Sequence, residues 1–203
     1  GTLNGAFGVV GVFNWTGGLL SYSALTVMAG SQLNLSGSAL KTLDGSIINN
    51  AGSAVWTGSG GIDSYHNAVI NNLAGGLFEA QADATLYYNE GIGGPTTINN
   101  AGTFRKSGNA VTTTIDFDIS FHNPGTLEVL SGTLNIAGTL ANYSNHALTG
   151  GTYRVLGTFK FLLADIITNS AVITLEGSAA RIVSQSDVDA LLNFVFNAPG
   201  YAT

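Results

Sequence analysis

A short motif built around two asparagines recurs along the chain, and it constrains the fold more than any other sequence feature. The motif reads Ile48-Asn49-Asn50-Ala51-Gly52, with copies at residues 70–75 and 98–102 and a weaker one at residues 121–125. Its second asparagine falls at positions 50, 72, 100 and 123, in steps of 22, 28 and 23 residues. Self-similarity at a period of roughly 20 to 50 residues is typical of solenoids and related repeat folds.

Short segments that alternate between apolar and polar residues lie between these motifs. In Thr126–Leu130 and Thr133–Ile136 apolar residues occur at every second position, which is the period of a half-buried β-strand. Gly and Asn at the joints tolerate the positive φ angles of tight corners. The sequence therefore predicts an all-β fold, a right-handed parallel β-helix (β-solenoid) of about nine rungs of roughly 22 residues each.

The composition excludes several other classes of protein. The 203 residues include 6 Lys and Arg against 12 Asp and Glu, and a net charge of -6 does not suit a phosphate backbone. No apolar run approaches the roughly 18 residues of a membrane helix. The absence of cysteine rules out disulfides and thiolate metal sites. We predict no nucleic-acid partner and no transmembrane segment.

The asparagines have a physical role in such a fold. In a parallel solenoid each residue lies about 4.8 Å from its counterpart in the next rung. Asparagines at one corner can then pass hydrogen bonds from amide to amide, so that buried polar groups satisfy one another. The predicted structural ladder consists of Asn50, Asn72, Asn100 and Asn123. Simple tolerance of the turn conformation by Asn is the alternative.

The chain is predicted to form one β-solenoid domain over residues 1–203, with a C-terminal cap over residues 186–203. Residues 186–194 predict a short helix, with Ser186 as N-cap and acids in its first turn. A further irregular rung is the alternative. The sequence shows no cap at the N-terminal end, and an uncovered rung favours stacking on another chain or on a preceding segment.

Several segments carry a resemblance to a known group of proteins. They are residues 13–18, 33–37, 41–45, 49–52, 98–107, 148–153, 167–171 and 181–183. Over nearly its whole length the chain resembles the repeat modules of large adhesin-like and autotransporter-like β-solenoid proteins of bacterial surfaces. The resemblance implies an extracellular or cell-surface location and a structural or adhesive role, in which the chain is a fragment of a longer polypeptide or associates end to end.

Clustered carboxylates are the residues that would support chemistry on such a scaffold. Asp116 and Asp118 would point the same way from one strand and could pair as acid and base or share a cation. An ordinary polar strand face is the explanation that we favour, because apolar residues over 115–121 form a core strand on the opposite side. Three histidines are well separated in the sequence: His66, His122 and His146. We predict no catalytic residue, no metal site and no cofactor.

These observations predict a non-enzymatic extracellular structural protein, a rod or filament-forming subunit of a bacterial surface or matrix fibre. The expected partner is a second copy, stacked end to end. The alternative is a glycan-binding adhesin module of a larger surface protein. Its candidate glycan contacts are Tyr87 and Tyr88, in an insertion between residues 72 and 100. A polysaccharide lyase or hydrolase is the third hypothesis.

Overall fold

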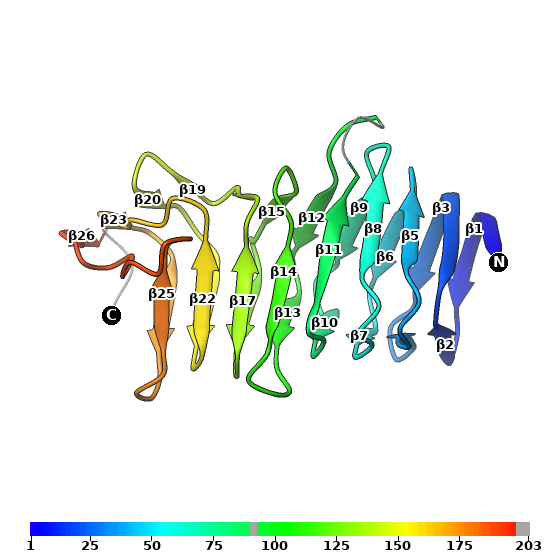
Figure 1. Ribbon diagram of the computed structural model, residues 1–203, viewed down its shortest axis with the longest axis horizontal. Helices are drawn as coiled ribbons and strands as arrows, with labels where there is room; N and C mark the ends of the chain where they lie inside the picture. The colour runs from blue at the N-terminus through cyan, green and yellow to red at the C-terminus, as the bar shows by residue number, and fades with distance from the viewer. Residues whose placement is uncertain (90–92, 198–203) are drawn as a thin grey trace.

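The protein is an elongated stack of β-strands, with residues 2–9 at one end and residues 196–197 at the other (Figure 1). The computed structural model describes residues 1–89 and 93–197. Within these residues there is no helix, and every strand pairing is parallel except the one between β19 (Tyr143–Ser144) and β20 (Ala147–Leu148). The all-β parallel β-solenoid predicted from the repeat is confirmed.

Each turn of the solenoid crosses three faces in succession. The first face holds β2 (Val12–Trp15), β4 (Gln32–Leu35), β7 (Ser53–Trp56), β10 (Leu77–Ala80), β13 (Thr103–Lys106), β16 (Thr126–Val129), β21 (Thr152–Val155) and β24 (Val172–Leu175). The second face holds β5 (Lys41–Asp44), β8 (Ile62–Tyr65), β11 (Ala84–Tyr88), β14 (Thr112–Ile115), β17 (Thr133–Ile136), β22 (Thr158–Phe161) and β25 (Arg181–Val183). The third face holds β6 (Ile47–Asn50), β9 (Val69–Asn72), β12 (Thr97–Asn100), β15 (Ser120–His122) and β18 (Thr139–Leu140).

The remaining strands join or extend these faces. The long strand β3 (Gly18–Val27) belongs to two of them, because its first half pairs with β5 and its second half with β6. Strand β1 (Thr2–Val9) lies along β3. A small sheet contains β19, β20, β23 (Thr168–Asn169) and β26 (Phe196–Asn197).

The solenoid has about seven turns of roughly 23 residues, fewer than the nine rungs predicted. Successive strands of the first face begin 20 to 26 residues apart, because the corners between them differ in length. The ends of the chain also use residues without adding turns. Strand β1 runs beside β3, and residues 184–190 fold back against β25.

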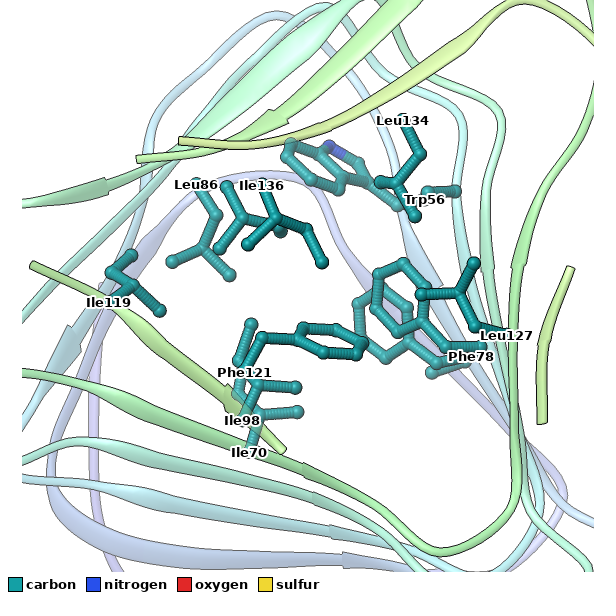
Figure 2. Close-up of a cluster of buried hydrophobic side chains, with 14 of the residues drawn as sticks. Trp56, Ile70, Phe78, Leu86, Ile98, Ile119, Phe121, Leu127, Leu134 and Ile136 are labelled. Atoms are coloured by element: carbon teal, nitrogen blue, oxygen red, sulfur yellow. The ribbon is translucent and has the colours of Figure 1, made fainter. Parts of the chain in front are cut away.

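The core fills the space between the three faces. Most strands of four residues alternate half-buried and buried positions, so every second side chain points inward. Figure 2 shows Trp56, Phe78 and Leu127 of the first face pointing toward Leu86 and Ile136 of the second and toward Ile98 and Phe121 of the third. Burial of each large apolar side chain contributes about 1.5–3 kcal/mol.

Residues 186–194 do not form the predicted capping helix, so that prediction is wrong. Asp187 adopts a left-handed conformation (φ 60°), which ends any helical path. The segment runs back along β25 instead, with hydrogen bonds from Ser184 N to Val188 O (2.8 Å) and from Ala190 N to Ile182 O (2.9 Å). Pairing with the free edge of a strand outweighs a helix too short to be stable alone. Residues 198–203 of the predicted cap lie outside the described residues.

Glycines form a second column beside the asparagines at the corner between the third and first faces. They are Gly52, Gly76, Gly102 and Gly125. A Cβ atom on Gly102 would overlap with the carbonyl oxygen of Gly76, and one on Gly125 would overlap with that of Gly102. The backbones of successive turns therefore approach one another here so closely that only glycine fits.

We expect Gly102→Ala to lower the free energy of unfolding by about 2 kcal/mol, because the added methyl group meets backbone atoms of the preceding turn. Chemical denaturation would measure the change. The neighbouring exposed Ala101 offers a control, since Ala101→Ser adds a small polar atom toward solvent. Equal stability of the two variants would contradict the close stacking at this corner.

Candidate functional site

The four asparagines singled out in the sequence lie in one buried column at the end of the third face. The side chains of Asn50, Asn72, Asn100 and Asn123 are almost completely excluded from solvent. The Nδ2 atom of each donates to the Oδ1 of the next, over 2.8 Å from Asn50 to Asn72 and 2.7 Å for the two later steps. The amides therefore satisfy one another from turn to turn.

The same amides also tie the third face to the first. Asn50 Nδ2 donates to Leu77 O (2.8 Å), Asn72 Nδ2 to Thr103 O (2.9 Å) and Asn100 Nδ2 to Thr126 O (2.8 Å). Each acceptor is the first residue of a strand of the first face, and that strand lies one turn beyond the strand that follows the donor's own corner. The ladder thus fixes both the spacing of successive turns along the rod axis and the angle between the third and first faces.

The column extends beyond the asparagines found by sequence. Asn142 exchanges two hydrogen bonds with the backbone of Asn123, from Asn123 N to Asn142 Oδ1 (2.6 Å) and from Asn142 Nδ2 to Asn123 O (3.1 Å). It lies 19 residues after Asn123 and outside the motif, so the motif gave no signal for it. At the other end, the Oδ1 of Asn50 is buried without a hydrogen-bond partner, beside the apolar Val27.

The first asparagine of each motif forms a parallel ladder on the outside. Asn71 Nδ2 donates to Asn49 Oδ1 and Asn99 Nδ2 to Asn71 Oδ1, each over 2.9 Å. These side chains are half-buried. Solvent competes for their hydrogen bonds, so the outer ladder contributes less to stability than the buried one.

We expect Asn100→Ala to lower the free energy of unfolding by about 3 kcal/mol, because it removes the buried hydrogen bonds that join Asn100 to Asn72 and Asn123 and leaves Asn123 Oδ1 without its donor. Asn99→Ala, on the outer ladder of the same strand, should lose less than about 1 kcal/mol. Thermal or chemical unfolding of both variants gives the comparison. The buried ladder would lose its assigned role if the two substitutions were equally mild.

Charged side chains form another column that the sequence analysis missed, along the outside of the first face. Its residues alternate in sign, namely Glu79, Arg105, Glu128 and Arg154, and Glu176 continues the series just after the end of β24. Arg105 Nε lies 2.7 Å from Glu128 Oε2, and Arg154 forms two hydrogen bonds with Glu176 at 2.8 and 2.9 Å. The sequence did hold a signal for this column, because charged residues of opposite sign occupy equivalent positions in successive repeats. Exposed pairs of this kind contribute little to stability.

Three buried polar side chains on the inner side of the strands have perturbed ionisation. Burial lowers the pKa of Lys41 and of Lys106, whose ammonium groups donate to Ala39 O (3.0 Å) and Ser107 O (2.7 Å). Burial also raises the pKa of Tyr153 to about 12, and the nearby Asn123 amide offsets only part of this effect. The Tyr153 hydroxyl makes no hydrogen bond of acceptable geometry.

We expect Tyr153→Phe to raise the free energy of unfolding at neutral pH by about 1 kcal/mol, because it removes a buried and unpaired hydroxyl. Tyr153 also makes stability depend on pH. Its folded-state pKa lies above the unfolded value, so the unfolded state loses its proton first and the free energy of unfolding falls as the pH rises from ~10 toward 12. Urea denaturation between pH 9 and 12 should show a smaller alkaline loss in the variant. An unchanged slope would show that other groups control this range.

Asp116 and Asp118 do not lie on the face of one strand, and the predicted core strand over residues 115–121 is wrong. Strand β14 ends at Ile115 and β15 begins at Ser120. Residues 116–119 form the corner between them, with Asp118 in a left-handed conformation (φ 61°) and Phe117 exposed. The chain has to change direction here to reach the third face. The two acids therefore occupy an exposed turn, without the shared strand face on which an acid–base pair was argued.

The two candidate glycan contacts lie on opposite sides of β11. Tyr87 points outward and is 45% exposed, whereas Tyr88 packs against the core and donates from its hydroxyl to Gly93 O (3.1 Å). Residues 90–92 of the insertion lie outside the described residues. The structure therefore leaves Tyr87 as the accessible member of the pair.

The histidines are far apart and have different surroundings. His66 Nδ1 lies 2.7 Å from Asp44 Oδ1, and His146 Nδ1 lies 3.1 Å from Asp165 Oδ2. His122 is exposed on β15. Among residues 1–89 and 93–197, no group of three His, Asp or Glu side chains is arranged to hold a metal ion.

Comparisons with known proteins give no family for the chain. No family model matches it, and the searches of curated proteins and of solved structures found no significant match. No helix in the described part of the chain is long and apolar enough to span a bilayer. The class that the structure defines is therefore that of the parallel β-solenoids.

Proposed function

We propose that this protein is a non-enzymatic structural β-solenoid that serves as a rigid rod. The observation that carries the proposal is the unbroken ladder of the first face, where eight strands from β2 to β24 pair in parallel from turn to turn. Backbone hydrogen bonds along the rod axis resist both stretching and bending. The asparagine ladder adds side-chain hydrogen bonds in the same direction.

The edges at the two ends of this face favour axial association with further solenoid turns. Strand β24 exposes Val172 and Leu175, and at the other end Val12 of β2 is exposed. Residues 1–40 contain no charged side chain. Soluble β-proteins commonly protect such edges with charges, and neither β2 nor β24 contains a charged residue. We propose that these edges pair with another copy of the chain in a head-to-tail filament.

The setting that we propose for this rod is a bacterial cell surface or extracellular matrix. Support comes from the resemblance of its repeats to those of large surface adhesins. The low content of charged residues and the long polar columns of the outer faces also suit dense packing between rods.

Self-association can be tested by sedimentation and negative-stain electron microscopy of the purified chain. We expect concentration-dependent filaments with a regular axial repeat. Leu175→Lys, which places a charge on the β24 edge, should abolish them. Thr126→Lys, at an outward position in the middle of the same face, is the matched control and should assemble normally. A chain that stays monomeric at high concentration, or equal assembly of both variants, would exclude stacking through these edges.

A second role, the recognition of glycans at the side of the rod, is favoured by one observation. Tyr22 is 66% exposed and Tyr87 is 45% exposed. Tyr22 lies in β3 between the half that belongs to the second face and the half that belongs to the third, and Tyr87 lies near the end of β11 on the second face. Exposed aromatic rings offer apolar faces on which sugar rings stack.

A further inference from the structure

Acidic and aromatic side chains alternate on the outer surface of the second face. Strand β5 presents Asp44, β8 presents Asp63 and Tyr65, and β11 presents Tyr87. The strand register places Asp44 beside Tyr65 and Asp63 beside Tyr87. Neighbouring strands lie about 4.8 Å apart, so these four side chains form one contiguous area, which we call the tyrosine patch.

An aromatic stack borders the tyrosine patch at the corner. The ring of Tyr22 stacks on the imidazole of His66, with centroids 5.9 Å apart and planes inclined by 30°. The ring of Tyr65 meets the same imidazole edge-on at 5.2 Å. Tyr22 reaches across the intervening turn because that turn has Gly45, where a Cβ atom would lie 2.8 Å from the tyrosine ring.

The charge around the tyrosine patch is negative. Residues 1–104 contain one Lys and no Arg, and that residue, Lys41, is fully buried with its ammonium bound to Ala39 O. Burial raises the pKa of Tyr65, and the nearby carboxylates of Asp44 and Asp63 raise it further. His66 is the one titratable group that pairs with Asp44, and Ser21 Oγ donates to the other carboxylate oxygen over 3.1 Å.

Asp63 is the more available of the two acids. Its hydrogen-bonding neighbours are the side chain of Asn89 and the backbone of Ser64, and burial raises its pKa. Its neighbours on the outer surface are Tyr65, two residues farther along β8, and Tyr87, its register partner on β11. An ammonium group placed here would meet a carboxylate with aromatic side chains beside it, an arrangement that favours organic cations.

We propose that the tyrosine patch and Tyr22 bind a glycan of amino sugars, whose ammonium groups pair with Asp63 and Asp44 while its sugar rings stack on Tyr22 and Tyr87. The proposal rests on the glycan-recognition role and names its ligand class. It does not depend on filament formation. The flat strand surface suits an extended glycan laid across several turns, since the four strands involved follow one another along the rod axis.

The test is isothermal titration of the full chain with an oligomer of glucosamine, an N-acetylglucosamine oligomer of equal length and an oligomer of lysine. We expect the glucosamine oligomer to bind most tightly and to weaken as salt rises. Asp63→Asn and Tyr87→Ala should each weaken it about tenfold. Asp118→Asn, which removes an exposed acid from the same corner farther along the rod, should change binding less than about twofold. Circular dichroism and Tm would show that the outward-facing variants remain folded.

Each other outcome overturns a defined part of the proposal. Equal binding of the acetylated oligomer would leave glycan recognition standing but remove the role of the carboxylates. Equal binding of the lysine oligomer would reduce the site to a general ammonium site without sugar stacking. Equal weakening by Asp118→Asn would show that only the net negative charge attracts the oligomer. Failure of both sugar oligomers to bind would overturn the glycan role itself, whatever the filament experiment shows.

Discussion

The in-register stacking of parallel strands is the constraint on which the rest of the structure depends. It places each side chain about 4.8 Å from its counterparts in the turns before and after. An inward position must therefore be apolar or find a hydrogen-bond partner inside the fold. Lys41 and Lys106 find backbone carbonyls, and asparagine can pair with its own counterparts because its amide both donates and accepts. The same geometry stacks the side chains at each outward position into a column along the rod. The residues that occupy that position in successive turns decide whether the column is neutral, charged or aromatic.

The repeat made the fold and the buried ladder predictable, because Asn50 and its counterparts recur in identical surroundings. The number of turns was less accessible, since corners of different length and the returning segment after β25 use residues without extending the stack. The helix expected at residues 186–194 failed for a related reason. Local pattern favoured a helix, whereas an unpaired strand edge nearby offered the same backbone a more extensive set of hydrogen bonds.

The candidate sites were less predictable than the fold, because they join unlike residues from different turns. Asp63 and Tyr87 become neighbours only through the register of β8 and β11, and nothing in their local sequence indicates it. The pair Asp116 and Asp118 shows the converse, since two acids close in sequence lost their common direction where the chain turned a corner. Proximity in a solenoid follows the turn length rather than the residue number.

The buried asparagine ladder has a direction, since every amide donates toward the C-terminal end and the Oδ1 of Asn50 is left without a donor. The two ends of the rod therefore differ even in their side-chain hydrogen bonds. A duplicated whole turn would bring its own asparagine, which could accept from the turn before and donate to the turn after. An insertion of a few residues within a strand would instead move the asparagine out of register and break the ladder. Sequence change by entire turns is thus the mode of lengthening that this architecture tolerates best.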